Sequence, residues 1–455
     1  MPYLRGLEAF SPVKHLPTER FRDIVAPGRD EEVAVAPNRR NADEFPPATG
    51  NGKIYPSMYS SDLGTFEKSV KILHWAPQFG SETGTGKAIE GWLQASSSSG
   101  LDVTVVSEPR ASVVNPGFRV LSARGLAKKL TVFWREARST NVVHLHGAFD
   151  FRLSVVYLLL LFEKGRRIFT GQPLRIVMTP HGALSQQVFT RSVLKKRIYW
   201  YCVDRLLTKR IDMAICTTPV EARELGRLMP HVKMEVVPLV VSGRGEPAAK
   251  SGQSTCEMSP RGPLLCTLGR YDIGMKGLDL LIGAVLKLNR EGCPVRLRCI
   301  GYDRNHGTRG LEDYVRSVNA GEFVECTGPK YGGEKDLAVA ECDVFCMPSR
   351  YESFSYALIE GMESGLPVLV GAGACLTSYF DKDQQRTMVV APDADAWAAS
   401  IKRLLADPAT NLECTESTLQ GLYRTCSPSV VGESLGIIYR SIAASAGTAV
   451  LELES

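Results

Sequence analysis

Short apolar runs alternate with longer amphipathic stretches twice along this chain, and this alternation limits the possible folds more than any other feature. Strands that are separated by helices form βαβ units, which assemble into parallel sheets. A stretch rich in glycine, serine and proline, 242–262, separates the two series. The pattern predicts two doubly wound α/β domains in tandem, with a ligand cleft at the carboxyl ends of their strands.

Each series contains several runs of strand length. In the first domain, 68–241, the expected strands are 70–76, 102–107, 141–146, 175–179, 213–218 and 234–241. In the second domain, 263–427, they are 264–269, 296–301, 323–327, 343–347, 367–371 and 386–390. Residues 242–262 are expected to form a linker, and residues 428–455 a C-terminal helix and tail. The proline-rich residues 1–67 lack periodicity and are expected to be a disordered or loosely attached extension.

Composition argues against several classes of protein. A net charge of +5 over 455 residues is too small for a dedicated nucleic-acid binder, but it suits anionic substrates or an anionic membrane. The twelve cysteines include no CxxC pair, so buried reduced thiols of a cytoplasmic protein explain them better than disulfides or a zinc site. No secretory signal is expected, and the longest apolar run, 153–162, is too short to span a bilayer.

The strongest chemical signal is the segment 348–367, PSRYESFSYALIEGMESGLP, which follows an apolar strand and opens a helix. A helix N-terminus offers unpaired backbone N–H groups and a partial positive charge, which suit a diphosphate. Glu352 is expected at the strand end and Glu360 about two turns further on, inside the helix. Two carboxylates around an anion site suit the hydroxyl groups of a sugar and a ribose. For either residue alone, a surface glutamate is the alternative.

Two cations follow the first strand of the second domain. Arg270 leaves that strand and Lys276 precedes the next helix. Both can face one cleft and compensate the charge on a diphosphate leaving group without a metal, although solvated loop cations are the alternative. The DxD stretches at 381–383 and 393–395 are expected in a polar loop and at a helix cap, so no metal site is predicted there.

The first domain carries histidines and glycines at its strand ends. His144 and His146 share one face of an expected strand, and His181 follows a later strand. A zinc site lacks a third ligand of suitable spacing, so a packed core histidine is the better interpretation of His144. The glycine-rich loop 77–88 fails the spacing of a P-loop and has Ala88 where that motif needs a hydroxyl. A flexible loop that lines the cleft fits better.

With these motifs in view, residues 70–442 resemble the family 4 glycosyltransferases, which have the GT-B architecture of two Rossmann-like domains. The likeness is densest in TPHGAL at 179–184, in GRYDIGMKGLDLLI at 269–282 and in the segment 348–367. The spacing of Glu352 and Glu360 matches the E-x7-E signature of that family.

One departure from the family concerns the turn before the helix. The family commonly has Glu-Gly-Phe-Gly where this sequence has Glu-Ser-Phe-Ser. Ser353 and Ser355 are therefore expected to adopt the turn without the conformational freedom of glycine.

The resemblance implies a retaining, metal-independent hexosyltransferase that uses a nucleotide diphosphate sugar and no further cofactor. It also implies a role for each matching residue. Catalysis would involve His181, Glu352, Arg270 and Lys276. Donor binding would involve Gly80 or Gly84, Arg270, Lys276, the amides around Phe354 and Ser355, and Glu360, with Glu360 on the ribose, Glu352 on the transferred sugar and both cations on the diphosphate.

Such an enzyme would extend a saccharide or lipid-linked acceptor in the synthesis of a bacterial surface polysaccharide or glycolipid. A nucleotide-sugar epimerase and a non-catalytic GT-B scaffold are the alternatives. Basic and aromatic residues interleave over 191–210, which predicts contact with an anionic membrane, against the alternative of a solvated basic helix face. We expect a cytoplasmic enzyme, peripheral on the inner face of the cell membrane, with no nucleic-acid partner.

Overall fold

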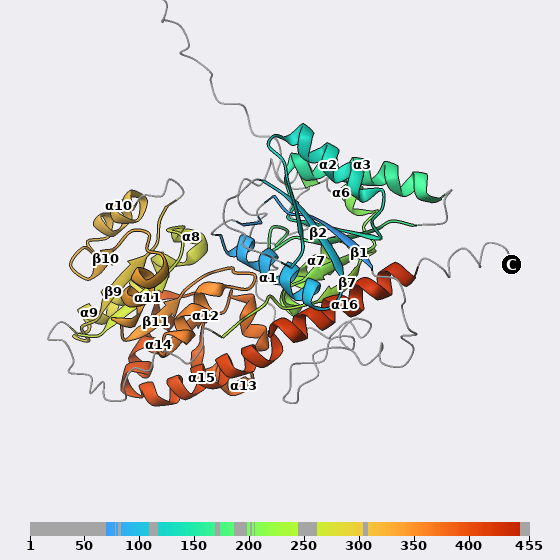
Figure 1. Ribbon diagram of the computed structural model, residues 1–455. Coiled ribbons are helices and arrows are strands. Elements are labelled where there is room, and N and C mark those ends of the chain that lie inside the picture. Colours follow the sequence, from blue (N-terminus) through green and yellow to red (C-terminus); the bar gives the residue numbers. More distant parts are fainter. Residues whose placement is uncertain are drawn as a thin grey trace, which may run out of the picture. The chain divides into compact units, whose positions relative to one another are not determined.

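The chain contains two parallel sheets, one in each half of the sequence (Figure 1). The computed structural model describes residues 70–77, 79–80, 83–108, 117–168, 173–185, 198–200, 203, 205–243, 262–303 and 308–445. The predicted extension at 1–67 and most of the predicted linker at 242–262 lie outside these residues. The pair of Rossmann-like α/β domains expected from the sequence is confirmed.

The first sheet has the strand order β3-β2-β1-β4-β5-β6-β7. Its strands are β1 (Lys71–Trp75), β2 (Asp102–Ser107), β3 (Arg119–Ser122), β4 (Val142–His146), β5 (Arg175–Thr179), β6 (Met213–Cys216) and β7 (Lys233–Val236). Its helices are α1 (Gly84–Ser98), α2 (Leu126–Ala137), α3 (Phe151–Ile168), α6 (Arg205–Thr208) and α7 (Pro219–Leu228). The sequence analysis missed β3, because none of the residues of this short edge strand is buried and no apolar run marks it.

The second sheet has the strand order β10-β9-β8-β11-β12-β13. Its strands are β8 (Leu264–Leu268), β9 (Arg296–Ile300), β10 (Val324–Cys326), β11 (Val344–Met347), β12 (Val368–Gly371) and β13 (Val389–Val390). The helices that follow them are α8 (Ile273–Lys276), α9 (Leu278–Arg290), α10 (Arg309–Ser317), α11 (Gly332–Ala340), α12 (Tyr356–Glu363), η4 (Cys375–Tyr379), α13 (Lys382–Met388), α14 (Ala394–Ala406) and α15 (Pro408–Thr425).

The strand expected at 386–390 is partly wrong, because its first three residues belong to α13. Asp381 caps that helix and forms a capping box with Gln384, which favours the helix over an extended strand. The DxD stretch at 381–383 is therefore a helix start and not a polar loop. Asp393 caps α14, as expected, by accepting a hydrogen bond of 2.8 Å from the Ala396 amide.

Helices cover both faces of the first sheet, as a doubly wound fold requires. Ile72 packs in one buried cluster with Ile89 and Trp92 of α1. The next residue, Leu73, points to the opposite face and packs with residues of α2 and α3 such as Phe133 and Val156. Figure 1 shows α2 and α3 on the side of this sheet away from α16 (Pro428–Ala444).

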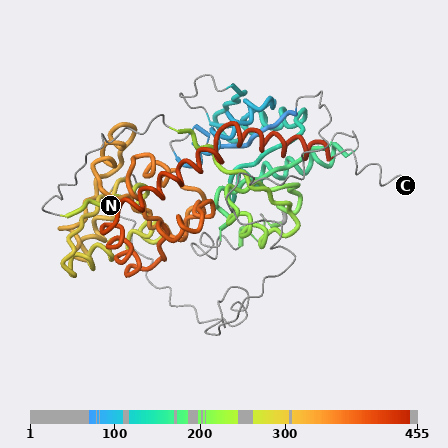
Figure 2. Tube along the Cα trace, turned by 90° about the horizontal axis from the view of Figure 1, so that it is seen from below, coloured from blue at the N-terminus to red at the C-terminus, as the bar shows by residue number. Residues whose placement is uncertain are grey.

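The final helix, α16, packs against the first domain although it follows the second in sequence. Leu435 and Tyr439 lie in the same buried cluster as Trp92, and Figures 1 and 2 both show α16 beside α1. A Cβ atom on Gly432 would lie only 2.4 Å from the Ala95 carbonyl oxygen, so the two helices approach closely at a position where only glycine fits.

The described cysteines lie mostly in the core. The ten cysteines among them are all free. Cys216, Cys266, Cys299 and Cys346 are buried on strands β6, β8, β9 and β11, where they act as small apolar core residues.

Candidate functional site

The predicted donor residues follow the two strands at which the order of the second sheet reverses. Neighbouring strands β8 and β11 lead away from each other into opposite halves of that sheet. Arg270 follows β8 and Glu352 follows β11. Ligands of doubly wound sheets bind at such a reversal, outside the carboxyl ends of the strands. The fold therefore brings both motifs to the edge of the sheet where a ligand is expected.

The loops after β8 and β11 are joined through Arg350. Its guanidinium makes a bidentate ion pair with Asp279, with N–O distances of 2.6 and 2.7 Å, and donates to the Gly274 carbonyl at 2.8 Å. Its backbone amide donates to the Met275 carbonyl at 2.9 Å. Paired planar groups of this kind fix geometry as well as charge. Arg350 thus holds the segment that carries Lys276 against the segment that carries Glu352.

Lys276 and Glu352, predicted separately as donor ligands, form an ion pair. Lys276 ends the short helix α8, which begins at the cap formed by Asp272. The backbone of Glu352 is fixed on both sides: its amide donates to the Gly373 carbonyl at 3.1 Å, and its carbonyl accepts from the Cys375 amide at 2.8 Å. Arg270 is exposed, and its side chain pairs with no group among the described residues.

The turn before α12 adopts the strained geometry expected from its sequence. Ser355 has a φ of 76°, in the left-handed region, and its hydroxyl caps the helix by accepting from the Leu358 amide at 3.3 Å. Ser353 is not among the residues with a positive φ, so only one of the two serines takes the left-handed conformation. Phe354 is buried and packs near Tyr356 and Tyr379, which anchors the turn.

Glu360 lies on α12 and is held by two lysines that the sequence analysis did not assign. Lys335 of α11 contacts its Oε1 atom at 2.9 Å, and Lys87 of α1 reaches the same atom at 3.6 Å. The Lys335 side chain is 13% exposed and the Lys87 side chain 47% exposed, so Lys335 is the better shielded partner. Pairs this distant in sequence leave no local signal.

The predicted loop at 77–88 leads from β1 into α1. Gly80 has a left-handed φ of 71°, and Gly84 is the first residue of α1. Thr83 caps that helix by accepting from the Gly86 amide at 3.1 Å. Residues 78, 81 and 82 lie outside the described part of the chain. This loop thus places Lys87 near Glu360, the carboxylate that Lys335 also contacts.

In the first domain, His181 and Gly182 form a turn that touches the second domain. Both residues have positive φ angles, 51° and 76°. A Cβ atom on Gly182 would lie 2.9 Å from the Cβ atom of Ser353, which is too close for any side chain. The turn after β5 and the Glu-Ser-Phe-Ser turn after β11 are therefore in direct contact, although the sequence predicted each motif independently.

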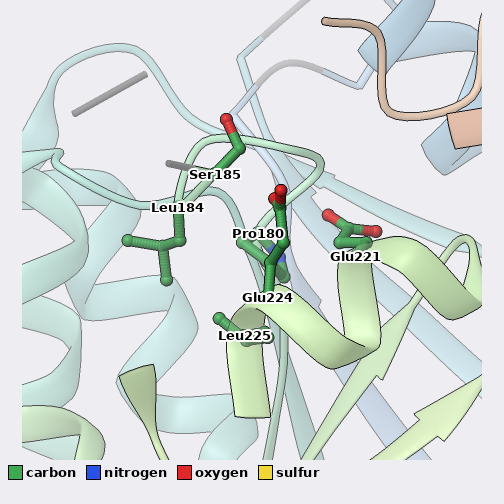
Figure 3. Close-up of a pocket in the computed structure, with 6 residues that line it drawn as sticks. All are labelled: Pro180, Leu184, Ser185, Glu221, Glu224 and Leu225. Atoms are coloured by element: carbon green, nitrogen blue, oxygen red, sulfur yellow. The ribbon is translucent and has the colours of Figure 1, made fainter. Parts of the chain in front are cut away.

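A buried carboxylate that the sequence analysis missed anchors this turn. Glu221 of α7 accepts from the Gly182 amide at 2.6 Å and from the Thr217 amide and hydroxyl, both at 2.8 Å. Burial raises the pKa of Glu221, while these hydrogen bonds act in the opposite direction. Beside it is a small pocket, in which Glu221, Glu224 and Leu225 of α7 face Pro180, Leu184 and Ser185 of the turn segment (Figure 3).

Three buried histidines, His74, His144 and His146, lie close to His181 of the turn. The Nε2 atom of His181 lies 2.9 Å from Nδ1 of His146, and Nε2 of His146 lies 2.9 Å from Nδ1 of His74. Burial lowers the pKa of His181 to about 4 and that of His74 to about 3, so both rings are neutral near pH 7. His74 was not predicted, but it stands opposite His144 in the register of β1 and β4.

His144 is a core histidine with both ring nitrogens bonded, as the sequence analysis favoured. The Thr179 hydroxyl donates to the Ile215 carbonyl, so it accepts from His144 Nε2 at 2.8 Å. The other nitrogen, Nδ1, then accepts from the Tyr439 hydroxyl at 2.6 Å. These two contacts define a single tautomer for His144.

His74 also supplies the third ligand that a metal site appeared to lack in the sequence. One ring nitrogen from each of His74, His144 and His146 lies within 4.8 Å of the others. Yet both nitrogens of His144 already bond to protein groups, as do Nδ1 of His74 and both nitrogens of His146. A metal ion would have to break these hydrogen bonds, so the donor set fits a hydrogen-bonded network better than a metal.

The predicted membrane segment at 191–210 lies largely outside the described residues. Among the helices that the structure describes, none combines the length and apolar character needed to cross a membrane.

Two Rossmann-like domains in tandem, with the predicted motifs after the strands at the sheet reversal, define the GT-B class of fold. Residues 259–420, which include the second sheet, match the family described as "Glycosyl transferases group 1". This match covers the second domain, so over that part the chain is similar to the group 1 glycosyltransferases.

Several solved structures share the fold. A sucrose-phosphate synthase from Thermosynechococcus elongatus aligns with a TM-score of 0.64 and 18% identity, covering 83% of this chain and 100% of the other. The Anabaena protein HepE in complex with UDP-glucose aligns with a TM-score of 0.60 and 12% identity, covering 82% of this chain and 99% of the other.

Curated relatives align over a shorter stretch. The MMP alpha-(1->4)-mannosyltransferase of Mycolicibacterium hassiacum is 28% identical over 145 residues, which cover 32% of this chain and 34% of that protein. The chain thus spans about a third of the length of such relatives.

Proposed function

We propose that this chain is a retaining glycosyltransferase that moves a sugar from a nucleotide diphosphate sugar to an acceptor hydroxyl. The observation that carries the proposal is the Lys276–Glu352 ion pair at the reversal of the second sheet. A cation for phosphate and a carboxylate for hydroxyl groups stand side by side there, and the contact between Gly182 and Ser353 brings the turn of His181 to the same region.

Donor binding would exchange the partners of this pair. Lys276, together with the exposed Arg270, would bind the diphosphate, because charge-assisted hydrogen bonds to phosphate are strong. Glu352, released from Lys276, would accept hydrogen bonds from the hydroxyl groups of the transferred sugar. Glu360, held by Lys335, would accept from the ribose hydroxyl groups.

In the reaction, the bond between the anomeric carbon and the diphosphate oxygen breaks, and a bond from the acceptor oxygen to that carbon forms on the same face. The acceptor hydroxyl gives its proton to the leaving phosphate, so charge and atoms balance. Arg270 and Lys276 would stabilise the negative charge that develops on the diphosphate, which is the role a metal ion has in other transferases. His181 would contact the sugar near the reacting carbon.

The acceptor would be a saccharide or a lipid-linked saccharide of a surface polysaccharide or glycolipid. Relatives support this class: one is described as a phosphatidyl-myo-inositol mannosyltransferase from Mycolicibacterium smegmatis, 30% identical over 144 residues. The enzyme would act in the cytoplasm, at the inner face of the membrane.

The test is a thermal-shift screen against a panel of nucleotide sugars, because a ligand that binds the folded state raises the melting temperature. UDP-glucose is the first probe, since HepE binds it. The donor so found is then incubated with the protein, alone and with candidate acceptors. A product that retains the anomeric configuration and forms only with acceptor supports the proposal. An epimer formed from donor alone would instead identify an epimerase, and no binding of any nucleotide sugar would identify a non-catalytic scaffold.

A further inference from the structure

A chain of hydrogen-bonded histidines runs from the His181 turn into the core of the first domain. His181, His146 and His74 are linked by two contacts of 2.9 Å between ring nitrogens. His181 is half-buried, whereas His146 and His74 are buried. At the inner end, the Nε2 atom of His74 is buried and has no hydrogen-bond partner among the residues that the structure describes. The row of histidines therefore ends at His74 in the core and at His181 at the surface of the turn.

The protons along this chain cannot be placed independently. A neutral imidazole has one N–H donor and one acceptor nitrogen. If His146 donates from Nδ1 to His181, its Nε2 must accept from Nδ1 of His74. If His146 instead accepts from His181, its Nε2 must donate to His74. Only these two arrangements satisfy both contacts, and they differ in the tautomer of all three rings at once.

The two arrangements give the turn opposite chemistry. In the first, Nε2 of His181 is an acceptor, so its other nitrogen, Nδ1, carries the proton. In the second, Nδ1 is bare and can accept. The neighbouring groups do not interrupt the chain: both nitrogens of His144 are engaged with Thr179 and Tyr439, and Trp92 only packs its ring against His146 and His181.

We propose that His146 and His74 are positioning residues that fix the tautomer of His181, and thereby decide whether Nδ1 of His181 donates to or accepts from a bound ligand. His74 acts over two hydrogen bonds, because its Nε2 atom is either protonated or bare and this choice sets the tautomers of His146 and His181. That the ligand is the sugar of a nucleotide sugar rests on the proposed function. The coupling of the three rings does not.

The experiment compares the whole protein with two variants at His74, which is buried on β1 and reaches His181 only through His146. His74→Asn keeps a polar group near the position of Nδ1, whereas His74→Leu removes it. Long-range ¹H–¹⁵N correlation spectra distinguish protonated from bare ring nitrogens. With only seven histidines in the chain, selective labelling and a His181→Gln variant assign the His181 signals. Melting temperatures confirm that each variant is folded.

We expect the wild type and His74→Asn to show one tautomer of His181, and His74→Leu to show a mixture of two. His146→Leu, which removes the middle link, should have the same effect as His74→Leu. An unchanged His181 spectrum in all folded variants would overturn the proposal. So would stoichiometric zinc in the purified protein that disappears in His74→Leu, because the rings would then be metal ligands.

A titration separates this inference from the proposed function. With UDP-glucose as the probe, His74→Leu should lower affinity by about two- to tenfold, the size of one neutral hydrogen bond, and leave affinity for UDP unchanged. Altered spectra with unchanged affinity for a sugar donor that the wild type binds would show that the tautomer is coupled but does not serve the sugar, which would overturn the second half of the proposal. Failure of the wild type to bind any nucleotide sugar would refute the proposed function alone, since the spectra need no ligand.

Discussion

Lys276 of α8 and Glu352 after β11 neutralise each other in this structure, across 76 positions of sequence. Each side chain is about one-fifth to one-quarter exposed, so solvent screens the pair only in part. A donor diphosphate would compete with Glu352 for the lysine. Substitutions of Lys276 and Glu352 should therefore affect the binding of nucleotide diphosphate and of nucleotide sugar differently.

Replacing Lys276 or Arg270 by Ala should weaken the binding of both nucleotide diphosphate and nucleotide sugar. The loss should be about 1.5–3 kcal/mol, the contribution of a hydrogen bond to a charged group. Glu352→Gln should lower turnover but leave nucleotide diphosphate affinity nearly intact, because free nucleotide has no sugar. Calorimetric titration of each variant, beside initial rates, measures both. Loss of nucleotide binding in Glu352→Gln, with unchanged binding in Arg270→Ala, would show that the roles are reversed.

Glu360 should depend on Lys335 far more than on Lys87. Lys335→Met removes the shorter and better shielded ion pair of a largely buried carboxylate, so both stability and UDP affinity should fall, by about 1–3 kcal/mol. Lys87→Met removes a half-exposed partner and should cost less than about 1 kcal/mol. Melting curves and UDP titrations of the matched pair measure the difference. Equal losses in the two variants would contradict the assignment of Lys335 as the main partner.

Transfer should not need a divalent metal. Arg270 and Lys276 supply two positive charges near the proposed diphosphate position, and Asp381 and Asp393 are occupied as helix caps. Initial rates should survive an excess of EDTA. Loss of activity that manganese or magnesium restores would show that a metal carries part of the charge compensation.

The protein should lose stability as the pH falls below about 6.5. Burial lowers the pKa of His74 to about 3, and those of His144 and His146 also fall well below the ordinary value. In the unfolded chain these rings take up protons near pH 6.5, so acid favours unfolding. His74→Leu should flatten the dependence of the unfolding free energy on pH by up to about 1.4 kcal/mol per pH unit between about pH 6 and pH 4.

Chemical denaturation at a series of pH values measures that slope. His231→Leu, at an exposed position, controls for the removal of one histidine. An identical slope in the wild type and His74→Leu would show that His74 takes up its proton over the same pH range in the folded and the unfolded protein, so that burial does not lower its pKa.

The segment 191–210 should bind anionic membranes. It carries seven basic residues beside three aromatic ones, and only one acidic residue. Co-sedimentation at low salt should recover more protein with anionic vesicles than with neutral ones. Replacing Lys195, Lys196 and Arg197 by Gln should remove the difference. Equal recovery of the wild type with both vesicle types would refute the prediction.

The strands and the donor motifs could be predicted from the sequence because each is defined by a pattern within one short segment. Strand runs, the E-x7-E spacing and the Gly-Arg…Lys segment each fit within about twenty residues. It could not find Lys335 beside Glu360, or Glu221 beneath Gly182, because these contacts depend on how separate helices pack. His74 was also missed, although its strand was predicted. It lies opposite His144 because of the register between β1 and β4, and that register cannot be read from either segment alone.

The position of α16 has a consequence for how the chain is made. Its residues Leu435 and Tyr439 complete the buried cluster around Trp92, and Tyr439 bonds to His144. The ribosome synthesises β1 to β7 long before it reaches these residues. The apolar surface that α16 covers therefore stays exposed in the first half of the chain until α16 has been synthesised. Chaperone dependence should therefore be concentrated in nascent chains that end between residues 241 and 428. A separately expressed fragment 68–241 would expose the same apolar surface. It should therefore aggregate unless α16 is supplied as a second polypeptide.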